Sequence, residues 1–266
     1  MGTKERLLEL FEARKGSFLS GEEIAQTLSV SRTAVWKAVN ALRQEGYPIE
    51  AATNRGYCLG ECADVLSEQG VRRFLGQDGP QLELTVLPSV DSTNTWVRDR
   101  AALGAPEGCV VMAGEQTAGR GRRGRTFYSP KDTGVYMSLL LRPEFPAECA
   151  PRITIAAALG VCRALRTFGA DAAIKWPNDV YAGGKKLSGI LSELGTQGGG
   201  RPYIVCGIGI NVGQRAFPGE LAETATSLLL ETGHTVALER VISEVLCALA
   251  PLFPACGEDA AYAALM

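Results

Sequence analysis

The stretch with the greatest chemical potential reads EQTAGRGRRGR and covers residues 115–125. It places glycines at positions 119, 121 and 124 and arginines at positions 120, 122, 123 and 125. Glycines let backbone amides approach a ligand, and guanidinium groups match the oxygens of phosphates and carboxylates. The alternative is a solvated basic loop or a second nucleic-acid patch, but such loops usually hold fewer glycines and do not connect two buried strands. The stretch therefore predicts a binding site for phosphate or carboxylate.

Two familiar nucleotide motifs do not explain this stretch. Its glycines match GxGxxG, but a Rossmann loop opens a helix, whereas TFYSPKDTG after Arg125 predicts a turn into another strand. That fingerprint does not include four arginines either. The chain also has no GxxxxGK[ST] string, which excludes a Walker A loop.

A second candidate site is IKWPNDV, residues 174–180. Lys175 follows a short apolar segment, and Pro177 biases Trp176 toward an extended backbone. The lysine is therefore expected to project from a rigid turn. Taken alone, the motif is equally consistent with a structural turn and with a functional site.

Histidine and cysteine narrow the possible chemistry. His234 is the single histidine, and nothing near it resembles a nucleophile elbow, so a Ser-His-Asp or Cys-His mechanism and a His-rich metal site are excluded. The cysteines lack a CxxC pair and mostly lie in apolar stretches, which predicts small buried hydrophobes in a reducing compartment rather than disulfides. They occupy positions 58, 62, 109, 149, 162, 206, 247 and 256.

Composition is that of a globular protein. Hydrophobic residues make up 46% and charged residues 21%, and the formal net charge of −2 confines any nucleic-acid surface to a local patch. The charged N-terminus lacks the apolar core of a signal peptide, and no apolar run approaches the roughly 18 residues that span a bilayer. We expect a cytoplasmic protein that does not enter a membrane.

Residues 1–60 predict a winged helix-turn-helix domain. A helix over residues 4–14 is followed by a second that begins at Ser20, with Glu23 in capping-box position, and by a third that begins at Ser31. PIEAA and YCLG then predict two short strands around a turn. Helix, helix, tight turn, helix and hairpin is the order of winged helices that bind DNA.

The third helix carries the charge pattern of a DNA-reading element. It holds three basic residues and no acid between Ser31 and Arg43, whereas residues 1–58 contain eight basic and seven acidic residues. The alternative is a packing or dimerisation module whose charges face water. The candidate DNA-binding residues lie opposite the apolar stripe of this helix, or at the tip of the wing: Arg32, Thr33, Trp36, Lys37 and Arg55.

The remaining chain predicts an α+β domain. Residues 61–80 read as a linker with a helix, and residues 81–266 as alternating strands and helices that end in a helix over 235–253. Several strand pairs, such as DVYA and KLSGILSEL around AGGKK, have hairpin-length connections. The sheet should therefore be mixed and flanked by helices.

Together these motifs resemble those of biotin–protein ligases. GRGRRGR, KWPND, DSTN (residues 91–94), KLSGIL (186–191) and GIGIN (207–211) all occur, and the resemblance runs from about residue 4 to 255. Residues 1–60 resemble the DNA-binding domain of the bifunctional bacterial members, which also repress transcription. The resemblance implies a catalytic domain similar to class II aminoacyl-tRNA synthetases, with a biotin carboxyl carrier protein, operator DNA and a second copy of the chain as partners.

The resemblance also implies roles for individual residues. The biotin pocket would be lined by Ser92, Thr93, Asn94 and Gln116, with Arg120, Gly121 and Arg122 over the carboxylate and adenylate phosphate and Lys175 beside the reacting atoms. ATP would be bound by Arg122, Arg125, Phe127, Asn178, Lys186 and Asn211, with Asp179 as the candidate Mg²⁺ ligand.

The implied reaction explains these residue types. The carboxylate of biotin must attack the α-phosphorus of ATP, and both are anions, so the cations of Arg120, Arg122 and Lys175 are expected to neutralise and align them. A glycine-rich loop would shield the adenylate from water until a carrier lysine arrives as the nucleophile. Lys175→Ala is therefore predicted to abolish adenylate formation.

The sequence departs from the family in two places. Phe127 stands where well-known members have tryptophan, so stacking on adenine should be weaker. Members usually continue into a small SH3-like domain after the last helix, whereas this sequence ends at AAYAALM, so we expect a form without it and transfer activity less secure than biotin binding. A repressor that only senses biotin or its adenylate is the main alternative, and a lipoate or octanoate ligase is disfavoured by GRGRRG.

Overall fold

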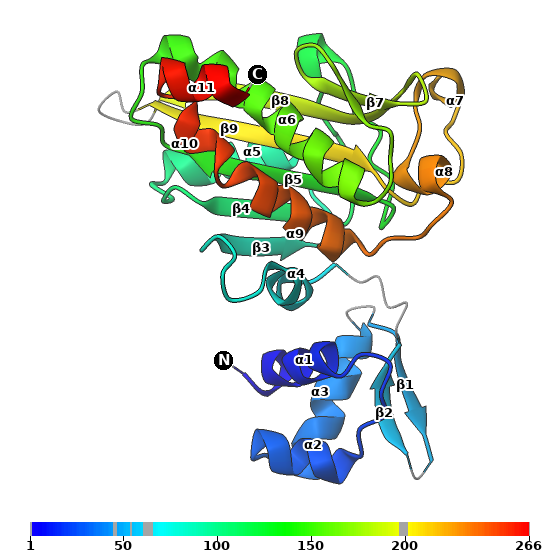
Figure 1. Ribbon diagram of the computed structural model, residues 1–266. Helices are drawn as coiled ribbons and strands as arrows, with labels where there is room; N and C mark the ends of the chain where they lie inside the picture. Colours follow the sequence, from blue (N-terminus) through cyan, green and yellow to red (C-terminus); the bar gives the residue numbers. More distant parts are fainter. Residues whose placement is uncertain (1, 45–46, 54, 61–65, 197–201, 266) are drawn as a thin grey trace. The chain divides into compact units, whose positions relative to one another are not determined.

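The computed structural model describes residues 2–44, 47–53, 55–60, 66–196 and 202–265 (Figure 1). The chain divides into two compact units, Met1–Phe74 and Leu75–Met266. Residues 61–65 of the expected linker, with Cys62, lie outside the described residues. Within the described part, no helix is long and apolar enough to cross a membrane.

The first unit has the predicted order of elements. Helices α1 (Thr3–Ala13), α2 (Gly21–Leu28) and α3 (Arg32–Gln44) precede an antiparallel pair, β1 (Ile49–Ala52) and β2 (Gly56–Leu59). The Oγ of Ser20 accepts a hydrogen bond from Glu23 N (3.0 Å), and the Oγ of Ser31 accepts one from Ala34 N (3.2 Å). These side chains satisfy amides that the first turn of a helix leaves free, which is why the helices begin there.

Apolar periodicity builds the core of this unit. On α3, Val35, Val39 and Leu42 are at most 1% exposed, as predicted, and they pack with α1 and α2. The opposite face of α3 is left to solvent. The winged helix-turn-helix prediction is confirmed.

The second unit is built on a mixed sheet with the order β3-β4-β5-β9-β8-β7-β6 in the described residues. The strands are β3 (Glu83–Leu87), β4 (Cys109–Ala113), β5 (Gly134–Leu141), β6 (Ala173–Lys175), β7 (Asp179–Ala182), β8 (Lys185–Thr196) and β9 (Pro202–Asn211). β3 and β4 are parallel, and the other neighbours are antiparallel. The predicted mixed sheet is confirmed.

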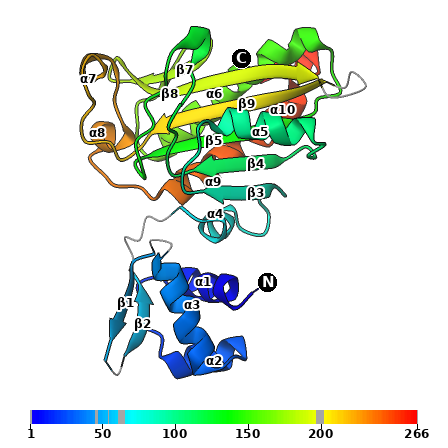
Figure 2. The ribbon, with the colours of Figure 1, turned by 180° about the vertical axis from the view of Figure 1, so that it is seen from behind.

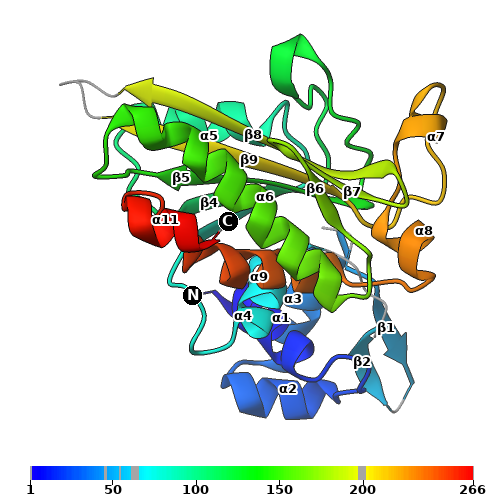
Figure 3. The ribbon, with the colours of Figure 1, turned by 45° about the horizontal axis from the view of Figure 1, so that its top comes forward.

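Helices cover both faces of this sheet. Figure 3 shows α6 (Ala150–Thr167) and α9 (Leu238–Leu249) on one face, and Figure 2 shows α5 (Thr93–Ala102) on the other. Every residue of β4 and β5 is consequently buried. This explains why β4 reads as an unbroken apolar run, and β5 as one interrupted by Ser138, rather than as alternating patterns. The remaining helices are α4 (Glu68–Leu75), α7 (Leu221–Thr224), α8 (Leu228–Thr232), α10 (Leu252–Ala255) and α11 (Asp259–Leu265).

The C-terminal helices differ from the prediction. The single helix expected over 235–253 is two helices, because α9 ends at Leu249 and α10 begins after Pro251, which lacks the amide hydrogen that a continuous helix needs. The short helices α7 and α8 were not predicted, since four or five residues are too few to show a helical period.

The described cysteines form no disulfide with one another, and most are buried, as predicted. Burial raises the pKa of the Cys206 thiol to about 12 and that of Cys256 to about 11. These thiols therefore stay protonated near neutral pH and act as apolar packing groups. Two described cysteines are less buried: Cys149 is partly buried, and Cys247 on α9 is exposed.

Candidate functional site

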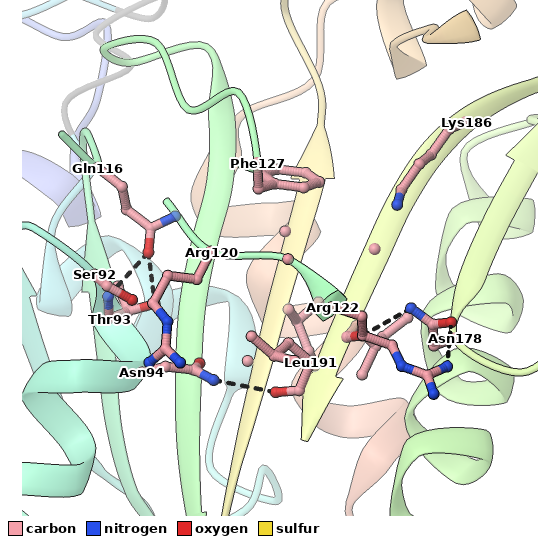
Figure 4. Close-up of a pocket in the computed structure, with 16 residues that line it drawn as sticks. Ser92, Thr93, Asn94, Gln116, Arg120, Arg122, Phe127, Asn178, Lys186 and Leu191 are labelled. Atoms are coloured by element: carbon pink, nitrogen blue, oxygen red, sulfur yellow. Dashed lines mark hydrogen bonds between the residues drawn. The ribbon is translucent and has the colours of Figure 1, made fainter. Parts of the chain in front are cut away.

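Two cavities adjoin in the second unit, and the smaller one, of about 450 Å³ with open solvent included, lies over strands β8 and β9 (Figure 4). Segments that are far apart in the sequence meet at this smaller cavity: the start of α5, the glycine-rich loop (residues 119–127), the PND turn (residues 177–179) and the two strands. The predicted site residues that line it are Ser92, Thr93, Asn94, Gln116, Arg120, Gly121, Arg122, Phe127, Asn178 and Lys186. Glycines at 189, 207 and 209 form part of its floor.

One end of the smaller cavity is polar but uncharged. The side chains of Ser92, Thr93 and Asn94 are at most 4% exposed. Gln116 Oε1 accepts hydrogen bonds from Thr93 N (2.9 Å) and Thr93 Oγ1 (3.0 Å). Ser138 Oγ lies 2.7 Å from Thr93 Oγ1 and 2.6 Å from Asn94 Oδ1. Such an end suits a neutral ligand group that both donates and accepts hydrogen bonds.

A larger cavity of about 1470 Å³, open solvent included, adjoins the smaller one. Its lining contains four basic side chains and one acidic side chain among the described residues: Arg122, Arg123, Arg125, Lys186 and Asp179. The rings of Phe127, Tyr128 and Phe217 also line it. Cations beside aromatic rings suit a ligand that joins phosphates to a planar group.

The glycine-rich loop connects the buried strands β4 and β5, as the sequence predicted, and the structure folds it as a hairpin. Gly121 N donates to Arg125 O (2.7 Å), and Phe127 N donates to Gly119 O (2.9 Å). At its tip, Arg123 and Gly124 have φ values of 58° and 73°, a backbone conformation that glycine adopts without strain. These bonds present successive arginine side chains to the two cavities.

The arginines of the loop have different partners. Arg120 forms an ion pair with Glu193 (Nη2 to Oε1, 2.7 Å), whereas Arg122 Nη1 donates to the neutral Asn178 Oδ1 (2.9 Å). Arg122 also lines both cavities. It is therefore the loop cation best placed to meet an anion where the cavities join.

Lys186 lines both cavities, and its Nζ lies 2.8 Å from Asp179 Oδ1. Lys175 is placed differently. It is exposed and lines neither cavity, and its Nζ lies 3.1 Å from Tyr181 Oη and 4.3 Å from the centroid of that ring. Tyr181 does line the larger cavity, so the side chain of Tyr181 lies between Lys175 and that cavity.

The donors for a metal ion are few. In the described part of the chain, no group of three or more His, Cys, Asp or Glu side chains gathers. Asp179 lines the larger cavity, and its Oδ1 contacts both Lys186 Nζ and Asn178 Nδ2. A single carboxylate fits Mg²⁺ held mainly by phosphates and water rather than a cage of protein ligands.

Asn211, the last residue of β9, lines the larger cavity. Its Nδ2 donates to Thr226 O (2.9 Å), so it joins β9 to the segment before α8. Sequence reasoning missed three residues that form hydrogen bonds with the predicted ones: Ser129, Ser138 and Glu193. Only Glu193 carried a signal, as the charged residue of the apolar strand ILSEL.

The predicted DNA-binding residues form an exposed face in the first unit. Arg32, Thr33, Trp36 and Lys37 on α3 are exposed, with Trp36 at 56%, and Arg55 lies between β1 and β2 with its guanidinium 4.0 Å from the Phe18 ring. The Nε and Nη2 of Arg43 instead donate to Ile49 O at the start of β1 (2.9 and 2.7 Å). Arg43 thus connects α3 to the wing.

Comparisons with known proteins agree with both units. Residues 86–211 match the biotin/lipoate A/B protein ligase family, and residues 3–58 match an HTH domain. The chain is 39% identical to the bifunctional ligase/repressor BirA of Bacillus subtilis, over 91% of this chain and 76% of that protein. It is 37% identical to BirA of Escherichia coli, over 82% and 67% respectively.

A solved structure extends the likeness to the fold. The biotin protein ligase from Aquifex aeolicus, in complex with biotin and ATP, superposes with a TM-score of 0.59 at 34% identity, over 66% of this chain and 72% of that one. The chain combines a ligase-type unit with an HTH-type unit, and its sequence identity to the bifunctional ligase/repressors extends over most of its length. It therefore groups with the bifunctional members. The chain belongs to the biotin–protein ligase family.

Proposed function

We propose that this protein activates biotin with ATP to give biotinyl-5′-AMP and transfers the biotinyl group to a lysine of a biotin carboxyl carrier protein. The observation that carries the proposal is the pairing of the cavities. An uncharged polar pocket adjoins a cavity rich in cations, and Arg122 lines both. Such a pair suits a ligand with a neutral head and a carboxylate, held next to a nucleotide.

Each cavity takes one reactant in this proposal. The ureido ring of biotin contacts Ser92, Thr93, Asn94 and Gln116, and the valerate chain points toward Arg122 under Gly121. ATP occupies the larger cavity, where Arg125 and Lys186 face its phosphates, Phe127 offers a ring to the adenine, and Asn178 and Asn211 provide amides. Mg²⁺ accompanies the nucleotide, with Asp179 as its protein ligand.

The chemistry requires no nucleophile from the enzyme. A carboxylate oxygen of biotin forms a bond to the α-phosphorus, and the bond to the leaving pyrophosphate breaks. The neutral amine of the carrier lysine then attacks the carbonyl carbon, AMP leaves, and the amine loses its proton to solvent. Cations that approach both anions lower the barrier of the first step, because they offset a repulsion that water otherwise screens.

Lys175→Ala is expected to abolish adenylate formation, as the family motif implies. In this proposal the Lys175 ammonium leaves the Tyr181 ring and reaches the reacting atoms once the anions are bound. Tyr181→Phe, which removes the hydroxyl and keeps the ring, is the companion variant and should retain most activity. The measurement is pyrophosphate release with biotin and ATP, and near-normal release by Lys175→Ala would remove this lysine from the role.

Mass spectrometry of a biotin acceptor protein tests the whole proposal. The intact chain is incubated with the acceptor, biotin, ATP and Mg²⁺, and the acceptor should gain one biotinyl group. Binding of biotin without pyrophosphate release or label transfer would favour a repressor that only senses the ligand. Labelling by lipoate or octanoate that biotin does not compete away would favour the other ligase class.

We further propose that the first unit binds operator DNA as a homodimer and represses transcription in the cytoplasm. The exposed face of α3 carries Arg32 and Lys37 beside Trp36, the arrangement that a major groove accepts. Arg55 on the wing extends the basic surface. Since phosphate contacts displace counterions, binding should weaken strongly as salt rises.

Arg43→Lys is expected to weaken DNA binding about three- to tenfold while leaving its salt dependence unchanged. Lysine keeps the positive charge but cannot donate the paired hydrogen bonds to Ile49 O, so the wing loses its fixed angle to α3. The probe is a duplex selected by the wild-type chain from a random pool, followed by fluorescence anisotropy at several salt concentrations.

Lys37→Gln is the matched control for this prediction. Loss of a side chain that contacts phosphate should reduce the slope of log K against log salt by about one. If Arg43→Lys changed the slope and Lys37→Gln did not, the two residues would have to exchange roles.

A further inference from the structure

Glu193, on strand β8, joins the uncharged end of the smaller cavity to the glycine-rich loop. Its Oε2 accepts a hydrogen bond from Asn94 Nδ2 (2.8 Å), and its Oε1 accepts one from Arg120 Nη2 (2.7 Å). The side chains of Arg120 and Glu193 are 41% and 27% exposed, so their ion pair is partly shielded from water. The Glu193 carboxylate thus forms hydrogen bonds both to Asn94 in the wall of the smaller cavity and to Arg120 in the glycine-rich loop.

The amide of Asn94 is buried, and its partners distinguish its two ends. Nδ2 donates to Glu193 and to Leu191 O (3.2 Å), while Oδ1 faces Ser138 Oγ (2.6 Å). A reversed amide would set Oδ1 against a carboxylate and a carbonyl, neither of which can donate. The charge of Glu193 therefore helps to determine which atoms of Asn94 are presented to a ligand.

Arg120 differs from Arg122 in what it offers the cavity. Figure 4 places Arg120 beside Asn94, and Arg122 beside Asn178 at the other end. The charge of Arg120 is balanced by Glu193, whereas Arg122 contacts a neutral amide and keeps its charge for an anion. The pair of Arg120 and Glu193 therefore covers the uncharged end without adding net charge to it.

The ion pair between Arg120 and Glu193 restrains the whole glycine-rich loop, because the loop is a hydrogen-bonded hairpin. Hydrogen bonds from Gly121 N to Arg125 O and from Phe127 N to Gly119 O fold it into a hairpin, and they restrict its backbone conformation. A tie between Arg120 and β8 consequently holds the whole loop over the cavity. Without that tie, the loop keeps the hydrogen bond between Arg122 and Asn178 and the edge contact of Phe127 with Tyr136, but it loses its ion pair to β8.

We propose that Glu193 is a positioning residue for biotin: it orients the Asn94 amide toward the ureido ring and, through Arg120, holds the glycine-rich loop closed over that ring. This inference rests on the proposed assignment of biotin to the smaller cavity. Glu193 itself does not line the cavity, so it acts through Asn94 and Arg120 rather than on the ligand. It also reassigns Arg120 from the reacting anions to the neutral end of biotin.

Glu193→Gln tests the proposal, because the neutral amide removes the ion pair with Arg120. Its single acceptor oxygen also cannot keep both the 2.8 Å bond from Asn94 Nδ2 and the 2.7 Å bond from Arg120 Nη2, which end on different oxygens of Glu193. The dissociation constant of the intact chain for biotin should rise about tenfold, through faster dissociation, while that for ATP changes less than about twofold. Isothermal titration gives both constants, and stopped-flow displacement gives the dissociation rate at low and high salt. An unchanged biotin constant, or equal losses for biotin and ATP, would overturn the proposal.

A double-mutant cycle separates positioning from a general structural effect. Arg120→Gln should also weaken biotin binding, and the double variant with Glu193→Gln should lose little more than the worse single variant, since both remove one tie. Additive losses would contradict the tie. Glu83→Gln, an exposed carboxylate at the start of β3, is the matched control and should leave both constants unchanged.

Two further outcomes have separate meanings: a Glu193→Gln variant that does not fold, and a wild-type chain that does not bind biotin. If Glu193→Gln does not fold, Arg120→Gln alone decides, because the exposed Arg120 can be replaced while Glu193 and Asn94 stay in place. Its biotin dissociation rate should rise and lose its dependence on salt, and an unchanged rate would refute the tie. If the wild-type chain itself fails to bind biotin, the proposed function fails rather than this inference alone.

Discussion

Arg122→Ala is expected to lower the rate of adenylate formation by about two to three orders of magnitude, the usual cost of removing a group that stabilises charge in a transition state. Arg122 lines the smaller cavity, the larger cavity and a third groove beside Trp176. Its present partner is the neutral Asn178, so its charge is available where a carboxylate must meet a phosphate.

The effect should fall mainly on turnover rather than on substrate binding. Repulsion between the carboxylate and the α-phosphate is greatest as the new bond forms, so a cation between them stabilises the transition state more than the bound substrates. Single-turnover pyrophosphate release measures this step directly. A decrease of less than about tenfold would be too small for a residue that aligns two anions.

Arg123→Ala is the matched control for this prediction. Arg123 is the next residue of the same loop, it is exposed, and it lines only the larger cavity. Loss of its charge should raise the KM for ATP slightly and leave the rate of the chemical step nearly intact. Equal losses for the two variants would mean that the loop contributes a diffuse positive field rather than one aligned cation.

Much of this fold could be predicted from local patterns. Ser20 and Ser31 cap helices where the capping rules put them, and the paired glycines 183 and 184, with φ values of 54° and 77°, turn β7 into β8 as AGGKK indicated. The order of the strands in the sheet could not be predicted from the sequence. β9 inserts between β5 and β8, and no local pattern encodes which apolar strands become neighbours.

The candidate site divides in the same way. Motifs identified the glycine-rich loop and the start of α5, whose side chains do meet in one cavity. They could not assign a partner to each charge. Arg120 was expected over the anions and is bonded to Glu193, and Lys175 was expected beside the reacting atoms and contacts Tyr181. Such pairings depend on side-chain reach across the sheet, which spacing along the chain does not reveal.

Gly207→Ala is expected to raise the dissociation constant for biotin by about two orders of magnitude, from overpacking together with lost hydrogen bonds. Gly207 and Gly209 lie two residues apart on β9 and so share a face. A Cβ at 207 would overlap the Asn94 amide, and one at 209 would come within 2.5 Å of Phe127 Cε1. The GIGIN motif thus leaves room for the two side chains that stand over the floor of the cavity.

The consequence at position 207 follows from the bonds of Asn94. Its amide is held by Glu193, Leu191 and Ser138, so we expect a shift that clears a new methyl group to lengthen these hydrogen bonds. Isothermal titration with biotin measures the loss, and thermal unfolding measures the accompanying strain. Gly213→Ala is the control, because a Cβ there would lie 3.6 Å from Thr133 O, an ordinary contact. If Gly207→Ala bound biotin as tightly as Gly213→Ala, the uncharged end of this cavity would not be where the ring of biotin binds.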